Sequence, residues 1–177
     1  MRTPFLSDFD LHLLAEGSHF QTWEKLGAHL AESDQGRGVH FAVWAPNAER
    51  VSVIGDFNGW DKNAHPMKLR PEAGVWEAFI PGIGAGALYK YRISSGGMAY
   101  HADKADPYGF AAELRPETAS KVFSLDGYAW GDSDWMKIRE GRQGLSSPIS
   151  IYEVHLGSWM RVPGGNPGWM TYRDLAV

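Results

Sequence analysis

The chain has 177 residues, of which 44% are hydrophobic, and a formal net charge of −4 from 17 basic and 21 acidic side chains. This hydrophobic fraction is enough to build a core, which excludes general disorder. No basic block occurs, so we expect no nucleic-acid partner. The absence of cysteine excludes disulfides, thiol catalysis and cysteine-based zinc sites.

The N-terminal ten residues include acidic side chains and lack an apolar signal core, and no apolar run is long enough to span a bilayer. We therefore expect a soluble, cytoplasmic protein with no membrane partner. Eight tryptophans are many for this length. Planar aromatic rings beside polar side chains suit sugars, which have apolar C–H faces and hydroxyl edges.

The first predicted element is a short helix over residues 7–16. Ser7 is a suitable N-cap, Asp10 occupies the capping-box position, and Gly17 follows the last turn. The side chains expected to face inward are Phe9, Leu13 and Leu14. The polar, Gly-rich segment that follows, up to residue 38, predicts one helical turn and then a loop.

Between residues 39 and 125, short runs rich in Val, Ile, Phe, Tyr and Trp alternate with turn residues. The predicted strands are 40–44, 50–54, 67–70, 75–80, 88–94, 100–102 and 121–125. We expect Gly96 and Gly97 to join two of them into a hairpin. Short strands at this spacing predict a mainly β chain with an immunoglobulin-like β-sandwich.

The segment 88–94 shows the clearest alternation, which is typical of a strand buried on one side. Its two sets are Tyr89, Tyr91 and Ile93 on the face expected to be buried, and Lys90, Arg92 and Ser94 on the other. A turn over 56–61 ends in Trp60 and Asp61. Surface turns on such a scaffold carry function more often than its strands.

The polar segment 126–148 is predicted to be a connector with one helical turn near Trp135. Ile149–Leu156 gives a strong strand signal, and Thr171–Asp174 predicts a capping box that opens a helix. A strand, a loop and a helix start are the beginning of a β/α unit, which cannot bury itself alone. We therefore expect the chain to end inside a second domain.

Several segments carry a family resemblance when they are taken together and in order. They read GSHFQTWEKLGAH, FAVWAPNAERVSVIGDFNGWD, HPMKLR, GVWEAFIPG, LYKYRI, ADPYGF, RPETAS and ISIYEVHLGSW. Over residues 17–177 the sequence resembles the N-terminal part of bacterial 1,4-α-glucan (glycogen) branching enzymes. The FNGWD segment recurs across family 48 starch-binding modules, whereas RPETAS and ISIYEVHLGSW are more specific to branching enzymes.

The resemblance implies four parts. Residues 1–32 are the tail of an extra N-terminal module, 33–125 a family 48 carbohydrate-binding β-sandwich, 126–148 a connector, and 149–177 the start of a family 13 (β/α)8 catalytic barrel. Such a barrel requires about 250 residues, so we expect only its truncated beginning here.

The reaction that the resemblance implies moves an α-1,4-linked segment to a 6-hydroxyl through a retaining mechanism with two carboxyl groups. In the family these lie on later barrel strands, so we expect no catalytic residue in this chain and no activity from it alone. Asp132 and Asp134 are interpreted as solvated charges, and Glu153 and His155 as packing residues of a barrel strand. The scattered histidines predict neither a metal site nor a cofactor.

After catalysis and metal binding are set aside, sugar binding is the remaining function to consider. Resemblance to family 48 modules, including the glycogen-binding module of AMP-activated kinase, implies that Trp60 is a stacking platform and that Lys90 contacts sugar hydroxyls. Asn58 bonds either the glucan or its own turn. One stacking ring predicts weak affinity for short glucans.

Two departures from the kinase module stand out. No second platform Trp occurs near Met98, and Ser120 stands where that module has Asn. Trp44 and Trp76 are expected in the core or in domain contacts. The expected partners are α-glucans (glycogen, amylose, maltooligosaccharides) and the family's catalytic barrel. The alternatives are a stand-alone glycogen-binding or interdomain packing module, or the same region of a debranching or trehalose-releasing family 13 enzyme.

Overall fold

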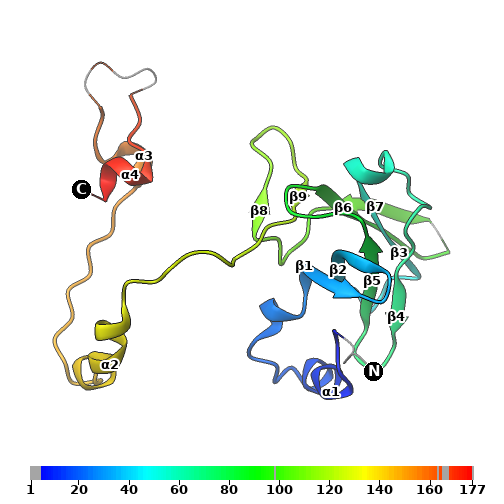
Figure 1. Ribbon diagram of the computed structural model, residues 1–177, viewed down its shortest axis with the longest axis horizontal. Helices are drawn as coiled ribbons and strands as arrows, with labels where there is room; N and C mark the ends of the chain where they lie inside the picture. The colour runs from blue at the N-terminus through cyan, green and yellow to red at the C-terminus, as the bar shows by residue number, and fades with distance from the viewer. Residues whose placement is uncertain (1–4, 98, 163, 165–167, 177) are drawn as a thin grey trace. The chain divides into compact units, whose positions relative to one another are not determined.

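The computed structural model describes residues 5–97, 99–162, 164 and 168–176. The chain divides into two compact units, Met1–Tyr128 and Ala129–Val177. The first unit holds the strands of both sheets and the first helix (Figure 1). Among the described residues, no helix is both long and apolar enough to cross a membrane.

Two antiparallel sheets make up the first unit (Figure 1). The first sheet has the order β1 (Gly27–Ser33), β2 (Gly36–Trp44), β5 (Val75–Pro81) and β4 (Lys68–Arg70). The second has the order β3 (Arg50–Gly55), β6 (Leu88–Ser95), β9 (Ser120–Lys121) and β8 (Ala111–Ala112), and β7 (Tyr100–Lys104) also pairs with β6. The predicted mainly β fold with two sheets is confirmed, while its immunoglobulin-like topology stays a prediction.

One hydrophobic core joins the two sheets. It contains fully buried side chains from both, such as Phe41 of β2, Val53 of β3, and Tyr89 and Tyr91 of β6. Alternate residues of each strand point the same way, so these side chains mark the two facing surfaces. The predicted inward face of β6 is confirmed at Tyr89 and Tyr91, and Ile93 packs half-buried against the same core. Lys90 lies on the outer face as predicted, but Ser94 on that face is buried.

β2 is buried on both faces, which explains its continuous apolar run. Ala42 points away from the shared core and joins a second cluster with Leu6, Leu11, Leu26 and Val75. This cluster is covered by α1 (Asp8–Glu16), whose Ser7 N-cap, Asp10 capping box and left-handed Gly17 are as predicted. A helix on the outer side of β2 thus removes the usual alternation of buried and exposed positions.

The inward face of α1 was predicted correctly at Leu14, which packs against the second cluster, and Leu13 is half-buried. The prediction was wrong at Phe9, which is 67% exposed, and it missed Leu11, which is buried. Phe9 lies about 200° around the helix axis from Leu11, so both cannot face the sheet. The capping box sets where the helix begins, and the ion pair of Asp10 with Lys25 at 3.2 Å orients the helix about its axis.

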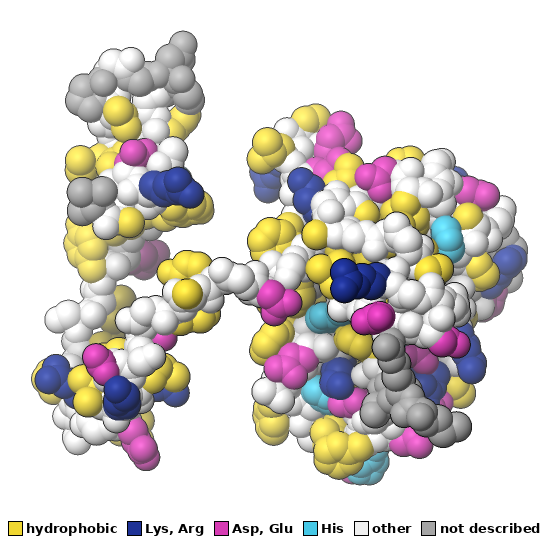
Figure 2. All heavy atoms as spheres, in the orientation of Figure 1, with side chains coloured by type: hydrophobic (Ala, Val, Ile, Leu, Met, Phe, Trp, Pro, Cys, Tyr) yellow, Lys and Arg dark blue, Asp and Glu magenta, His cyan; other side chains and the backbone are white. Residues whose placement is uncertain are grey.

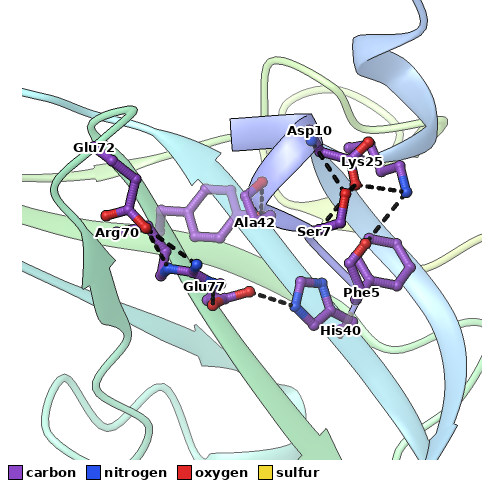
Figure 3. A network of polar contacts seen from close by, with 10 residues as sticks. Phe5, Ser7, Asp10, Lys25, His40, Ala42, Arg70, Glu72 and Glu77 are labelled. Atoms are coloured by element: carbon purple, nitrogen blue, oxygen red, sulfur yellow. Dashed lines mark hydrogen bonds and ion pairs between the residues drawn. The ribbon is translucent and has the colours of Figure 1, made fainter. Parts of the chain in front are cut away.

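A polar network fastens the N-terminal segment to the first sheet (Figure 3). Asp10 accepts hydrogen bonds from Ser7 and pairs with Lys25 at 3.2 Å, and His40 lies 3.2 Å from Glu77. The ring of Phe5 stacks on His40, with 4.1 Å between centroids. Burial pushes the pKa of Asp10 upward, but the hydrogen bonds from Ser7, with His19 and Lys25, outweigh it and hold the pKa well below its ordinary value.

Two strands of the first unit were not predicted. β1 pairs with β2 along its whole length, from Gly27 to Ser33, and β8 is a two-residue strand. β1 has few β-branched residues, so its β propensity did not indicate a strand. The strand is stabilised instead by its pairing with β2. The hairpin through Gly96 and Gly97, both left-handed, is confirmed.

The second unit contains three short helices, α2 (Ser133–Arg142), α3 (Leu156–Trp159) and α4 (Tyr172–Leu175), among its described residues. The predicted capping box of α4 is confirmed. The predicted strand over 149–156 is not formed, because no described residue pairs with it and a strand exists only with a hydrogen-bonded neighbour. None of the unit's described residues is buried, and hydrophobic side chains appear on its visible face among polar and charged ones (Figure 2). Ile149, Ile151 and Tyr152 are each at least 74% exposed.

Candidate functional site: a tryptophan platform beside Lys90

The turn after β3 places Trp60 on the surface. A 3₁₀ turn (η2, Asp56–Asn58) is followed by two left-handed residues, Gly59 with φ 62° and Trp60 with φ 61°. Gly59 adopts this conformation freely, whereas a residue with a side chain loses about 1–2 kcal/mol in it. Trp60 is the only non-glycine residue with positive φ among those described. Such strain concentrates at functional positions.

Asn58 holds this turn in place. Its Oδ1 accepts a hydrogen bond from the Gly55 N–H at 2.9 Å, and its Nδ2 contacts the Val53 carbonyl at 3.1 Å and His65 Nδ1 at 2.8 Å. Both amide protons are thereby used within the protein. The Trp60 N–H also donates to the Gly55 carbonyl at 2.8 Å. The side chain of Asn58 is thus committed to the turn that carries Trp60.

Lys90 and Trp60 come together from different elements. Lys90 projects from the outer face of β6, and its Nζ lies 6.0 Å from the centroid of the Trp60 ring. The same ammonium donates to Thr118 Oγ1 at 2.8 Å. Trp60 retains 38% of its surface exposed. An open indole face, a cation and a hydroxyl therefore lie within one small area of the surface.

Buried bonds position the loop that carries Thr118. The Asp106 carboxylate accepts hydrogen bonds from Tyr89 Oη at 2.6 Å and Tyr91 Oη at 3.1 Å, and the Asp106 N–H donates to Ser120 Oγ at 2.9 Å. Burial raises the pKa of Asp106 above its ordinary value, although the hydrogen bonds oppose the rise. Ser120, which replaces the Asn of the kinase module, is buried and is used in this network. The position of the missing second platform, Met98, lies outside the described residues.

This arrangement combines the groups that can hold a sugar. The indole face can stack on the C–H face of a pyranose, and Lys90 can donate to its hydroxyls. The Lys90 ammonium contacts the Trp60 ring and Thr118 Oγ1, and neither of these partners carries an ionisable group.

The carboxylates weighed in the sequence lie in the second unit. Asp134 accepts a hydrogen bond from Lys137 at 2.8 Å, and Asp132 begins α2. Glu153 is exposed, and His155 Nδ1 lies 3.0 Å from Ser158 Oγ. The described residues include no group of three or more His, Asp or Glu side chains arranged to hold a metal ion.

Trp44 and Trp76, the other two tryptophans weighed in the sequence, differ in burial. Trp76 is buried in the shared core and donates its Nε1–H to the Ala45 carbonyl at 3.0 Å, as predicted for a core residue. Trp44, at the end of β2, is 60% exposed. Trp44 is therefore a suitable reference for a surface indole outside the platform.

Comparison with known proteins shows what the first unit is similar to. Residues 25–109 match the family model of Carbohydrate-binding module 48 (Isoamylase N-terminal domain). A solved structure of Klebsiella pneumoniae pullulanase complexed with maltotriose is 28% identical, with a TM-score of 0.47 over 58% of this chain and 10% of that chain.

The chain as a whole is similar to 1,4-alpha-glucan branching enzymes GlgB. It is 56% identical over 173 residues to the enzyme of Paramagnetospirillum magneticum, covering 98% of this chain and 23% of the relative. It is 55% identical over 167 residues to that of Thermosynechococcus vestitus, covering 94% of this chain and 21% of the relative. The resemblance to the N-terminal part of branching enzymes is thereby confirmed. The chain spans less than a quarter of the length of these relatives.

Sequence reasoning missed Thr118 as a partner of Lys90. The RPETAS segment was noted for its resemblance, but nothing in its pattern places a threonine beside a strand residue 28 positions earlier. The outer-face alternation of β6 gave the one usable signal, because it put Lys90 and Arg92 on the same side.

Proposed function

We propose that this chain is the N-terminal, glucan-binding region of a 1,4-α-glucan branching enzyme, and that Trp60 and Lys90 hold the α-glucan. The observation that carries the proposal is the Trp60 ring, set in a strained turn that Asn58 fixes and placed beside the Lys90 ammonium. Strained backbone conformations cluster at functional positions, which supports a binding role for this ring.

The binding we propose is weak. Stacking on one ring adds about 0.5–1.5 kcal/mol beyond the area that it buries. A hydrogen bond between the protein and a neutral sugar hydroxyl replaces one to water, so its net contribution to the binding free energy is also only about 0.5–1.5 kcal/mol. Asn58 contributes indirectly, by holding the turn, because both of its amide protons already have partners.

Within the proposed enzyme, residues 33–125 form the carbohydrate-binding sandwich, to which β1 adds an edge strand from Gly27. Residues 1–32 are proposed to include the tail of an extra module, 126–148 a connector, and 149–177 the start of the catalytic barrel. The retaining transfer to a 6-hydroxyl takes place in that barrel, and residues 1–177 carry none of its catalytic carboxylates. Glycogen synthesis in the cytoplasm is the proposed setting.

Retention on glycogen tests the binding site. Native affinity electrophoresis in gels containing glycogen compares the unchanged chain with Trp60→Ala, Lys90→Met and Trp44→Ala. We expect the first two variants to migrate faster than the unchanged chain and the third to be retained normally. A Trp60→Ala variant that folds and is retained like the unchanged chain refutes the proposed platform.

The second candidate is a stand-alone glycogen-binding or interdomain packing module. Similarity to branching enzymes over 94–98% of the chain favours the first proposal, because the match continues well past the sandwich. It also favours branching over debranching or trehalose release. Incubating residues 1–177 with amylose is expected to give no new α-1,6 linkages, and their appearance contradicts the proposed location of the catalytic residues.

A further inference from the structure

A hollow of about 280 Å³ lies on the same unit as the platform and is lined by cations. Its polar lining comes from Arg50 and Ser52 of β3, Arg92 and Ser94 of β6, and Lys62 and Asn63 of the loop after the platform. No acidic residue is among those that line it. The hollow is separate from the contacts already described for Trp60.

Register places this hollow beside the platform. In the pairing of β3 with β6, Ser52 lies opposite Arg92 and Ile54 lies opposite Lys90. Arg92 and Lys90 are two residues apart on one strand face, which is about 7 Å. Trp60 and Lys62 are likewise two residues apart in the loop, so the loop and the strand each contribute one residue to the platform and one to the hollow.

The loop is fixed over the sheet by three hydrogen bonds. Ser52 Oγ donates to the Lys62 carbonyl at 2.7 Å, the Val53 N–H donates to the His65 carbonyl at 2.9 Å, and the Met67 N–H donates to the Val51 carbonyl at 2.8 Å. Lys62 is therefore held next to the strand pair by its own backbone. The arrangement is preformed, which reduces the entropy lost on binding a ligand.

The cations of the hollow are mostly uncompensated. Arg92 donates to Asp103 at 3.0 Å. Arg50 and Lys62 have no ion-pair partner among the described residues. Ser94, which is 7% exposed, and Asn63 are also lining residues. Two positive charges without an ion-pair partner, beside residues with hydroxyl and amide groups, suit a compact, doubly charged anion with several acceptor oxygens.

We propose that this hollow binds a phosphate monoester carried by the α-glucan that Trp60 holds. A phosphoryl group has the charge and the acceptor oxygens that these donors suit. The neighbouring Trp60 ring stacks on the sugar to which the phosphoryl group is attached. This inference rests on the proposed glucan site for the sugar part of the ligand, whereas the anion part depends on the hollow alone.

The test compares the binding of maltoheptaose with that of maltoheptaose phosphorylated on a 6-hydroxyl, by calorimetry on the whole chain. We expect the phosphorylated chain to bind about tenfold tighter, the gain that one charge-assisted hydrogen bond supplies. That gain is expected to shrink at high salt. Arg50→Gln with Lys62→Gln is expected to abolish the gain and to leave the affinity for neutral maltoheptaose unchanged.

The matched control removes two exposed cations elsewhere in the unit, through Arg37→Gln with Lys68→Gln, and is expected to keep the gain. Glucose 6-phosphate, titrated against Trp60→Ala while the side-chain NMR signals of Arg50 and Arg92 are followed, tests the hollow without the platform. Loss of neutral binding in Trp60→Ala with these signals still responding supports both sites. Equal affinity for the two maltoheptaoses, or an equal loss in both double variants, overturns the phosphate proposal but leaves the glucan site standing.

Discussion

Replacing Asn58 by Ala tests whether this side chain holds the platform turn. The change removes three hydrogen bonds, to the Gly55 N–H, the Val53 carbonyl and His65. At a net value of about 0.5–1.5 kcal/mol each, they contribute about 1.5–4.5 kcal/mol. The strain of about 1–2 kcal/mol at Trp60 is relieved when the turn relaxes, which returns part of this sum.

We therefore expect Asn58→Ala to lower the free energy of unfolding by about 2 kcal/mol. Urea unfolding followed by circular dichroism measures it, with Asn63→Ala as the control, because Asn63 is exposed and only its backbone N–H is bonded nearby, to Asp61. Retention on glycogen is expected to fall as well, since Trp60 loses its fixed orientation. A variant as stable as Asn63→Ala that nevertheless loses glycogen binding would falsify the structural role and make Asn58 a direct ligand.

Three further predictions concern other parts of the first unit. Because the pKa of Asp10 is depressed in the folded protein, its carboxylate stabilises the fold above its unfolded pKa of about 3.9, and this stabilisation is lost as the pH falls through and below that value. Asp10→Asn should therefore lower the melting temperature at pH 7 and flatten the decline of the melting temperature in acid. An unchanged acid profile in this variant contradicts the prediction. A Cβ on Gly38 would collide with the Ile80 carbonyl and meet Pro81 Cα at 2.8 Å, so Gly38→Ala should lose about 1–3 kcal/mol in urea unfolding, whereas Gly84→Ala, with open space around it, should lose almost none. Lys90→Met should keep the fold and weaken maltoheptaose binding in calorimetry, and unchanged affinity would show that the ammonium makes no sugar contact.

The central strands and the first helix could be predicted because local signals and packing agree there. Clean alternation in β6 and a complete capping box at Ser7 each specify one structure without help from distant residues. β1 and the rotation of α1 could not be predicted in the same way. Both depend on partners far along the chain, on β2 for the strand and on Lys25 for the helix face.

The candidate site shows the same division. Resemblance indicated Trp60, Lys90 and Asn58, but it could not indicate that the Asn58 amide bonds its own turn or that Lys90 donates to Thr118. The hollow beside them was not predicted, because Arg50, Lys62 and Arg92 are ordinary surface cations until register and loop bonds bring them together.

The predicted strand over 149–156 failed for a related reason. Its residues have strong β propensity, yet propensity cannot supply the neighbouring strand that a ladder requires. The segment is left exposed, with Ile149 and Ile151 more than 80% accessible. Exposed apolar patches of this kind are typical of surfaces that contact another protein segment.

The most direct test of the glucan site is an NMR titration of the whole chain with maltoheptaose, in which backbone and indole N–H signals are followed together. We expect saturable shifts at the Trp60 indole and at the backbone amides of Lys90 and Thr118, which disappear in Trp60→Ala. Shifts centred instead on the separate aromatic hollow that Trp23, Phe110 and Phe123 line, with a silent Trp60 indole, would place the sugar elsewhere and contradict the proposed platform.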